Sequence, residues 1–403
     1  MSAGLGTVTS VPISRGDRLR ILHTSDWHLG RTLHGVDLLE HQRAFLDHLV
    51  EVVREREVDV VLVAGDVYDR AIPAVPTVRL LSEALGRLSE AATVVVTPGN
   101  HDSAVRLGFG AGLMRDGVHL LASVEALDEP VVVSDGDGPV AFYGLPYLDP
   151  DSVRGLLAAD GDEPLARSHD AVVTAALDRV RADLATRPGT RSVVLAHAFV
   201  VGGTASESER DIRVGGVDSV PSSSFEGFDY VALGHLHGAQ SIGTGSPVIR
   251  YSGSPLAFSF GEKNQVKSSA LVDLDSDGRV EVELIPAPVP RRLAEVTGDL
   301  ATLLGGEFDD LRDAWLRVFV TDPVHPANLH ALVRDHFPYA LAIQHTPVGG
   351  VSVSDRRAVA ADADPVEVAV DFVAFATGGA PTETEAAVLR TAYETALARE
   401  TSL

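Results

Sequence analysis

The sequence has no cysteine among its 403 residues. Disulfides, thiolate zinc sites, iron–sulfur clusters and cysteine nucleophiles are therefore excluded. Any bound metal ion would have to be held by His, Asp, Glu or Asn side chains. Lysine is nearly absent as well, because Lys263 and Lys267 are the two lysines among 33 basic residues.

Long apolar runs and positive charge are also scarce. No stretch approaches the roughly 18 to 20 apolar residues that span a bilayer, and residues 1–18 lack the basic start and apolar block of a signal peptide. We therefore expect a cytoplasmic protein with no membrane partner. The 57 acidic residues give a formal net charge of -24, which argues against binding DNA or an anionic membrane through bulk charge. A nucleic-acid enzyme stays compatible, because metal ions and a local basic strip can supply positive potential where a phosphate binds.

The hydrophobic pattern predicts several domains. After a flexible leader at 1–18, β-branched runs of strand length alternate with amphipathic helical segments over residues 19–288, which is typical of a layered α/β fold with largely parallel strands. Three prolines between Pro286 and Pro290 suit a linker. A small α+β domain is expected at 289–360, followed at 361–403 by two C-terminal helices with an apolar stripe that dock on a partner.

Polar motifs follow the predicted strands, where sheets of this kind place their chemistry. They are Asp26-x-His28, Gly65-Asp66, Gly99-Asn100-His101-Asp102, His197, Gly234-His235-x-His237 and Tyr251-Ser-Gly-Ser-Pro. In an extended segment, residues two apart point to the same side, so we expect Asp26 and His28 to converge, and likewise His235 and His237.

Together these side chains offer enough oxygen and nitrogen ligands for two divalent ions that share one carboxylate. Imidazole and carboxylate ligands without thiolate suit manganese, iron or zinc. Two such ions, about 3.5 to 4 Å apart, lower the pKa of a shared water and clamp a phosphoryl group. Taken singly, each motif has a simpler interpretation: His197 as a core histidine, or Gly65-Asp66 as a turn with a helix cap. Their occurrence together, each after a strand, favours the metal site.

The series DxH, GD, GNHD, H and GHxH resembles the calcineurin-like metallophosphoesterase superfamily, whose fold is an α/β/β/α sandwich. Within it, the stretches HTSDWHLGRTLHG, GDVYDRAIP, SESERDIRVGG and YSGSPLAFSFGE are similar to the bacterial SbcD nuclease family, the catalytic subunits of SbcCD complexes. The resemblance covers about residues 19–290. It implies that Asp26, His28 and His237 hold one metal ion, that Asn100, His197 and His235 hold the other, and that Asp66 bridges both. Manganese is the expected metal.

The resemblance also implies a catalytic role for His101, which steadies the phosphate or protonates the leaving oxygen. Asp102 could orient His101 by hydrogen bonding, or could serve as a local turn or cap. Asp69 stands where archaeal and eukaryotic relatives carry a second active-site histidine, and we expect it to act as an acid behind a metal ligand.

DNA contacts are expected near the first metal pair and in a long loop. Arg31 and His34 follow the Asp26 and His28 motif, whereas Arg210 and Arg213 lie in the Ser- and Gly-rich loop from Gly202 to Phe225. Such a loop suits sequence-independent phosphate contacts, although a solvated loop without a ligand fits the same composition.

The family resemblance implies a DNA exonuclease and endonuclease for DNA repair and recombination. It further implies a homodimer through the segments after Asp69 and Asp102, joined with an SbcC-type ATPase in a heterotetramer. No phosphate-binding loop of the form GxxxxGK followed by Ser or Thr occurs, so ATP chemistry would need that partner. Two alternatives stay open: a phosphoesterase acting on a small cyclic nucleotide or a phosphoprotein, and a non-catalytic scaffold at DNA ends.

Overall fold

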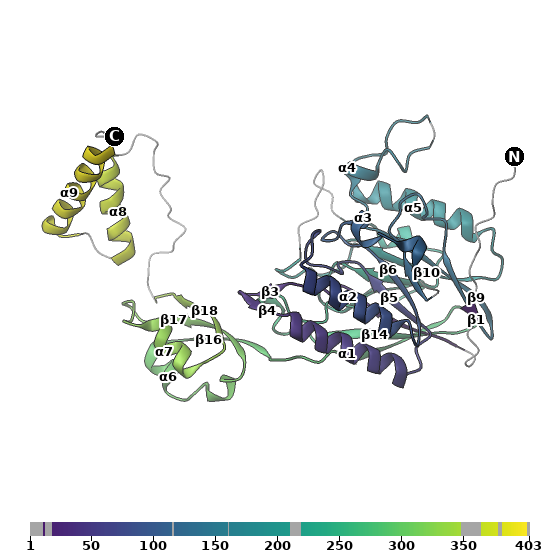
Figure 1. The fold of residues 1–403 in the computed structure, drawn as a ribbon, viewed down its shortest axis with the longest axis horizontal. Helices are drawn as coiled ribbons and strands as arrows, with labels where there is room; N and C mark the ends of the chain where they lie inside the picture. Colours follow the sequence, from purple (N-terminus) through teal and green to yellow (C-terminus); the bar gives the residue numbers. More distant parts are fainter. Residues whose placement is uncertain are drawn as a thin grey trace. The chain divides into compact units, whose positions relative to one another are not determined.

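The computed structural model describes residues 11–12, 18–114, 117–159, 161–209, 219–347, 364–377 and 381–400. The chain forms two compact units, residues 1–345 and 346–403. Figure 1 gives the course of the chain through both units.

Two large sheets build most of the first unit. The six-stranded sheet has the order β15-β14-β2-β5-β6-β7. Its strands are β2 (Leu19–Thr24), β5 (Val60–Ala64), β6 (Thr93–Thr97), β7 (Val118–Leu120), β14 (Ser268–Leu274) and β15 (Val280–Pro286). The strands β2, β5, β6 and β7 run parallel, and β14 and β15 add an antiparallel edge.

The seven-stranded sheet has the order β1-β8-β9-β10-β11-β13-β12. Its strands are β1 (Val11–Pro12), β8 (Val131–Asp135), β9 (Gly138–Leu145), β10 (Arg191–His197), β11 (Tyr230–Gly234), β12 (Gln240–Ile242) and β13 (Val248–Tyr251). The strands β9, β10, β11 and β13 are parallel. Strand β1 falls inside the segment expected to be a flexible leader, and it pairs with β8.

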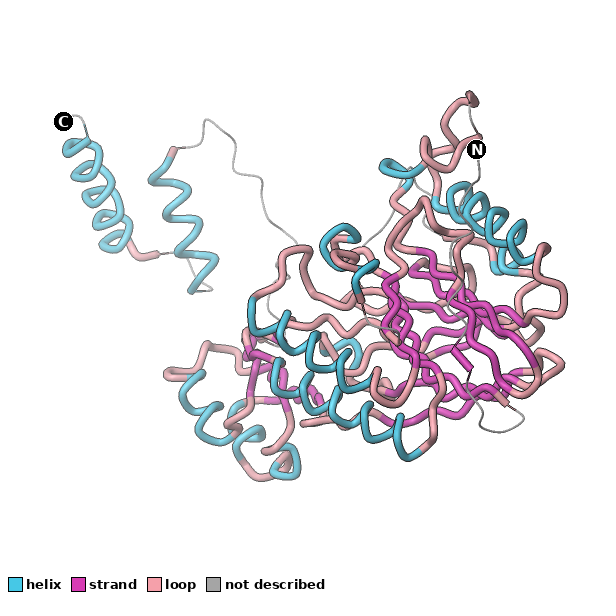
Figure 2. The backbone as a smooth tube through the Cα atoms, turned by 45° about the vertical axis from the view of Figure 1, so that its right-hand side comes forward, coloured by secondary structure: helices cyan, strands magenta, loops and turns pink. Residues whose placement is uncertain are grey.

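Alternating side chains along each central strand define the layers. In β5, Val60 and Leu62 enter the core between the two sheets, whereas Val61 and Val63 face a core shared with helices. Those helices are α1 (Leu39–Glu55) and α2 (Val75–Leu88). In β10, Val193 and Leu195 face the core between the sheets, and neighbouring residues face α5 (His169–Leu184). Figure 2 shows the strands gathered between these helices.

The resulting order of helices, sheet, sheet and helices confirms the expected α/β/β/α sandwich. Central parallel strands are buried on both faces, and the sequence VVLVA of β5 is accordingly apolar throughout. The remaining short elements of this sandwich are the hairpin β3 (Thr32–Leu33) and β4 (Val36–Asp37), the helices α3 (Ala104–Leu107) and α4 (Pro150–Val153), and the 3-10 turns η1 (Ala111–Leu113), η2 (Ser222–Phe225) and η3 (Phe260–Glu262).

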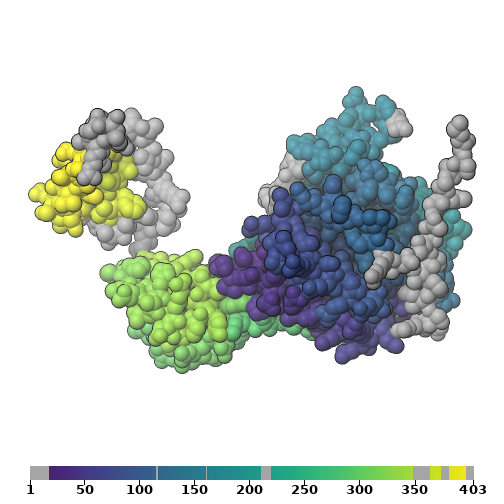
Figure 3. Space-filling view, viewed as in Figure 1, coloured from purple at the N-terminus to yellow at the C-terminus, as the bar shows by residue number. Residues whose placement is uncertain are grey.

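A small sheet with its own core follows the proline-rich segment. The parallel strands β16 (Leu293–Gly298), β17 (Trp315–Val320) and β18 (Ala340–His345) pack with α6 (Leu300–Leu304), η4 (Asp309–Leu311) and α7 (Leu329–His336). Trp315 joins a separate apolar cluster with Leu33, Leu38 and Phe258. Figure 3 shows this lobe against the β3–β4 hairpin.

The second unit contains the helices α8 (Pro365–Thr377) and α9 (Glu383–Glu400), which contact each other. Phe372 and Val388 expose more than half of their surface, whereas Val366 is buried. Within the described ranges, no helix combines the length and the apolar character needed to cross a membrane.

Candidate metal centre

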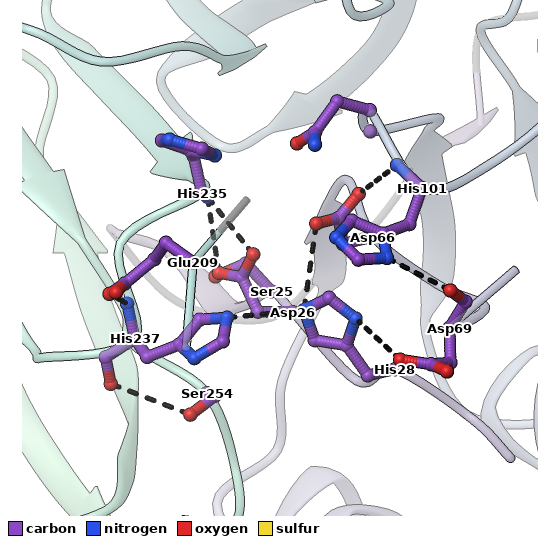
Figure 4. A network of polar contacts seen from close by, with 12 residues as sticks. Ser25, Asp26, His28, Asp66, Asp69, His101, Glu209, His235, His237 and Ser254 are labelled. Atoms are coloured by element: carbon purple, nitrogen blue, oxygen red, sulfur yellow. Dashed lines mark hydrogen bonds and ion pairs between the residues drawn. The ribbon is translucent and has the colours of Figure 1, made fainter. Parts of the chain in front are cut away.

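The carboxyl ends of strands from both large sheets bring the polar motifs together. The loops after β2, β5 and β6 contribute Asp26, His28, Asp66, Asn100 and His101. The last residue of β10 is His197, and the loop after β11 contributes His235 and His237. Figure 4 shows several of these side chains pointing toward one another. The site therefore lies where the edges of the two sheets meet, as expected for the crevice at the strand ends.

The first pair converges for a different reason from the one inferred from the sequence. Asp26 and His28 do not lie in an extended segment, because their φ angles are 53° and 42°. His235 is also outside the extended region, with a φ of 107°. The expected alternation of an extended strand is thus wrong here, and the side chains meet because the loops turn through left-handed residues. Such conformations cost about 1 to 3 kcal/mol each and persist where the surroundings fix them.

Backbone hydrogen bonds fix the loop after β2 against the loop after β5. The N–H of Asp26 donates to the Gly65 carbonyl at 3.1 Å, and the N–H of His28 donates to the Asp66 carbonyl at 2.9 Å. Gln42 of α1 supports the other side of the same loop. Its amide donates to the His28 carbonyl at 2.7 Å and accepts from the N–H of Gly30 at 2.9 Å.

Asp66 is the central carboxylate. Its Oδ2 lies 3.5 Å from Nε2 of His28 and 3.5 Å from Nε2 of His197, and its Oδ1 accepts from the N–H of His101 at 2.8 Å. All three of Asp66, His28 and His197 are buried. Asp66 therefore stands between the histidines assigned to the two ions, as a bridging ligand would.

Three sets of side chains come close enough to hold a cation. In each set, one ligand atom per residue lies within 4.8 Å of the others. The sets are Asp26 with His28 and His237, Asp26 with Asp66 and His197, and His28 with Asp69 and His101. The first two share Asp26, so the described residues can accommodate neighbouring cations.

His197 is surrounded by the side chains expected to share its ion. Its Nε2 lies 2.9 Å from Oδ1 of Asn100, and its Nδ1 lies 3.1 Å from the Ala64 carbonyl. The ring of His235 packs edge-on against that of His197, with centroids 5.4 Å apart. The backbone N–H of His235 donates to Asp26 at 3.0 Å. Its ring does not take part in the three sets found among the described residues.

Burial and neighbouring charges shift the pKa values of several side chains in the site. Burial would raise the pKa of Asp66, but His197 and His28 hold it well below its usual range. Burial would lower the pKa of His197, but Asp66 and Asp26 raise it to about 9. Burial lowers the pKa of His235 to about 3 and raises that of Asp26 to about 6. Without a cation, the cluster thus keeps a proton on His197 beside the ionised Asp66.

Two glycines are required for the approach of these loops. A Cβ on Gly65, whose φ is +83°, would lie 2.1 Å from Nδ1 of His197. A Cβ on Gly234 would lie 1.7 Å from the Ala64 carbonyl oxygen and 2.9 Å from the same Nδ1. The glycines of the GD and GH motifs therefore create the space that His197 occupies.

The structure shows that Asp69 and Asp102 have different roles near His101. Nδ1 of His101 lies 2.8 Å from the Asp69 carbonyl oxygen. The Asp102 carboxylate instead accepts from the backbone N–H groups of Val67, Tyr68 and Gly99 at 2.9 to 3.0 Å. Asp102 therefore fits the alternative of a turn-building residue. The hydrogen bond that orients His101 is made with the carbonyl of Asp69 instead. The Asp69 carboxylate lies 3.7 Å from Nδ1 of His28, behind that ligand.

The proposed DNA-contact residues fall in different places. Arg31 lies beside the site, where its guanidinium is 3.6 Å from the Asp69 carboxylate and 4.8 Å from the Phe258 ring centroid. His34 is exposed on the β3–β4 hairpin, with its ring 5.2 Å from that of Phe260. Arg210 and Arg213 lie outside the described residues.

Three supporting residues were not identified from the sequence. Gln42, Glu262 and Lys267 are buried polar side chains that bond to the ligand loops. Gln42 carried a usable signal, because it falls on the apolar face of α1 between Leu38 and Phe45. The sequence around Glu262 and Lys267 has no such periodicity.

The donor set fits divalent cations. Nε2 of His28 and Nε2 of His237 face each other at 3.1 Å inside a buried site that also contains Asp26 and Asp66. Convergent imidazole nitrogens and carboxylate oxygens without thiolates suit transition-metal dications. The residues are therefore able to hold the metal ions expected from the sequence.

Comparison with solved structures returns matches at low identity. One is the Thermus thermophilus protein TT1561, at 15% identity and a TM-score of 0.38, covering 66% of this chain and 99% of that one. Another is GAP50, the anchor in the inner membrane complex of Plasmodium, at 11% identity and a TM-score of 0.37, covering 83% and 99%. A dimetal phosphatase from Danio rerio matches at 13% identity and a TM-score of 0.35, covering 67% and 99%.

The family comparison is more extensive. The model of the calcineurin-like phosphoesterases matches residues 19–239, which is more than half of the chain and contains every ligand candidate described above. With the sandwich fold and the His and Asp sets in place, this protein belongs to the calcineurin-like phosphoesterase family.

Proposed function

We propose that this protein is a two-metal phosphodiesterase that cleaves DNA, similar to the SbcD nucleases. The observation that carries the proposal is a cleft of about 520 Å³ lined by Arg31, Arg70, Asn100 and His101. Asp69 and Asp102 line the same cleft, and both guanidinium groups lie 3.6 Å from the Asp69 carboxylate, so the lining carries little net charge in a protein whose net charge is -24. Guanidinium groups bind phosphate in a defined geometry. A polyanionic chain that passes the metal centre would meet them.

The proposed ligand roles are those that the family resemblance implies. Asp26, His28 and His237 would hold one ion, Asn100, His197 and His235 the other, and Asp66 would contact both. Bound cations of this kind, which we propose to be manganese, polarise phosphoryl oxygens and lower the pKa of a nearby water. The ring of His101 is fixed by the Asp69 carbonyl at 2.8 Å, and it lines the cleft. His101 is therefore placed to steady the phosphate or to give a proton to the leaving oxygen.

Cleavage of a DNA hairpin tests the substrate. Purified protein would be incubated with hairpin, linear duplex and a chromogenic small diester, each with Mn²⁺, Mg²⁺ or chelator. We expect Mn²⁺-dependent cleavage of the hairpin and slower turnover of the small diester. Preferred turnover of the small diester would favour a cyclic-nucleotide or similar substrate, and metal binding without hydrolysis of any substrate would favour a scaffold.

A homodimer is proposed through the segments that follow Asp69 and Asp102. Large apolar side chains there are exposed on α2, α3 and the adjoining turns: Ile72, Val75, Val105, Phe109 and Leu113 expose between 66% and 89% of their surface. Large apolar side chains exposed in these segments favour a protein partner. Sedimentation of Phe109→Glu against the unmodified protein would test it, with a shift to monomer expected.

An SbcC-type ATPase is the proposed second partner. The helices α8 and α9 form a unit of their own and expose Phe372 and Val388. We propose that they dock on the coiled coil of that ATPase. Deletion of the residues after Gly378 should leave hydrolysis of short single strands intact and abolish stimulation by the ATPase and ATP.

A further inference from the structure

A buried network of polar side chains lies behind His237, at the Nδ1 side of its ring. Lys267 is at its centre, with 3% of its side chain exposed. Its ammonium donates to Ser254 Oγ at 2.9 Å, to Gln265 Oε1 at 2.8 Å, to the Glu262 carboxylate and to the His237 carbonyl at 3.0 Å. Lys267 thus bonds directly to the main chain of His237. It reaches the His237 ring indirectly, through the Glu262 carboxylate.

The hydrogen bonds in this network have a fixed direction. An ionised carboxylate only accepts, so the hydroxyl of Ser208 donates to Glu262. Ser208 Oγ also lies 2.7 Å from Nδ1 of His237, and since its proton is committed to Glu262, it must accept from an Nδ1–H. Glu262 itself lies 3.3 Å from the same Nδ1. In the neutral ring, the nitrogen without a proton is then Nε2, which points at Nε2 of His28.

We infer that Ser208, Glu262 and Lys267 form a positioning relay that fixes the tautomer and orientation of His237, and thereby sets the affinity of the metal ion that His237 holds. The relay concerns the metal centre and does not depend on DNA as the substrate. Groups that bond the second nitrogen of a metal-ligating histidine change metal affinity by about 10- to 100-fold.

The relay also anchors part of the loop after β10. The N–H of His237 donates to Glu209 Oε1 at 2.8 Å, and Arg31 donates to the Ser208 carbonyl at 3.0 Å. Ser208 and Glu209 thus connect the ligand His237 with Arg31 of the cleft. A buried Lys–Glu pair that served stability alone would add little, because desolvation opposes its attraction, and it would not need to converge on one imidazole nitrogen.

Titration of the metal-stripped, full-length protein with Mn²⁺ tests the relay. Unbound Mn²⁺ is followed by its electron paramagnetic resonance signal, which yields the affinity of each site, and the melting temperature is measured without metal. Ser208→Ala is compared with Ser223→Ala, an exposed serine of η2. Lys267→Met is compared with Lys263→Met, whose ammonium pairs with Glu295 away from the site.

We expect Ser208→Ala and Lys267→Met to weaken one Mn²⁺ site by about 10- to 100-fold and to leave the other near its original affinity. Ser208→Thr, which keeps the hydroxyl, should restore binding, and both control variants should bind as the unmodified protein does. Loss of both sites together with a lower melting temperature would indicate a structural role and overturn the inference.

Unchanged Mn²⁺ affinity in a folded Ser208→Ala protein would also overturn it. If Lys267→Met does not fold, Ser208→Ala and Ser208→Thr decide the question, because they alter one partly exposed side chain. Absence of DNA cleavage by a protein that binds Mn²⁺ as expected would count against the proposed function alone.

Discussion

The Nε2 atoms of His28 and His237 lie 3.1 Å apart in a buried site. Nδ1 of His237 lies 2.7 Å from Ser208 Oγ, whereas the Asp69 carboxylate lies 3.7 Å from Nδ1 of His28, beyond hydrogen-bond distance. When Nδ1 carries the proton, the two Nε2 lone pairs repel each other unless a cation lies near both.

Metal binding should therefore stabilise the protein. A dication removes this repulsion and binds the folded state, and saturation to 100 times the Kd adds about 2.7 kcal/mol per site. We expect Mn²⁺ to raise the melting temperature of metal-stripped protein and EDTA to reverse the increase. An unchanged melting temperature at saturating Mn²⁺ would contradict the assignment of the site.

Replacing Asp66 by Asn should weaken both ions at once. The Asp66 carboxylate lies 3.5 Å from His28 and 3.5 Å from His197, and the amide keeps its shape but loses its charge. We expect Mn²⁺ affinity to fall at both sites and cleavage to drop to background. Asp128→Asn, an exposed aspartate beside Arg179, is the control. Full activity of Asp66→Asn would exclude a bridging role.

Replacing His101 by Gln should slow cleavage by about 100-fold, a typical contribution of a general acid. Metal content should stay the same, because the proposed ligands are other residues. Metal analysis alongside single-turnover kinetics measures both effects. His101 also forms a possible cation set with His28 and Asp69, so loss of an ion in this variant would make His101 a ligand.

Metal affinity should rise with pH. Asp66 and Asp26 overcome the effect of burial and raise the pKa of His197 to about 9 in the metal-free protein. A protonated imidazole cannot bind a cation, so the proton must leave when metal binds. Below about pH 9, affinity should fall by up to about tenfold per pH unit. Calorimetry in buffers of different ionisation enthalpy should show release of about one proton at about pH 7.5. Affinity that is flat between about pH 6.5 and pH 8.5 would contradict this.

Replacing Gln42 by Leu should destabilise the loop after β2. The change removes the side-chain partner of the buried His28 carbonyl and of the N–H of the exposed Gly30, and an unsatisfied buried group costs about 1 to 3 kcal/mol. We expect a lower free energy of unfolding in urea and weaker Mn²⁺ binding. Gln344→Leu, an exposed position on β18, is the matched control, and equal effects of the two changes would refute a positioning role for Gln42.

Much of the fold could be predicted because its determinants are local. The apolar run of β5 and the helical spacing of Leu46, Leu49 and Val53 in α1 each specify their own element. Helix α5 begins at His169, where the Ser168 side chain caps it. Strand β1 could not be predicted, because it depends on pairing with β8 rather than on its own two residues.

The metal centre, like the fold, could be predicted only in part. Its ligand types and their position after strands are properties of the sequence, and from them a metal centre without thiolates could be predicted. The direction of each side chain could not be predicted, because Asp26 and His28 adopt left-handed backbone angles. Hydrogen bonds to the carbonyls of Gly65 and Asp66 maintain these angles. The role of Asp102 was likewise set by three backbone N–H groups from two loops.

By itself, the sequence determined the chemistry available to this protein: cysteine-free ligands, an α/β sandwich and the membership of its motifs in one family. Only the tertiary structure decided which groups meet and what supports them. Local patterns encode burial and secondary structure within a few residues, whereas Lys267 and His237, or Gln42 and His28, become neighbours through the packing of separate elements. Such contacts depend on the whole fold, because each buried polar group must find its partner across the chain.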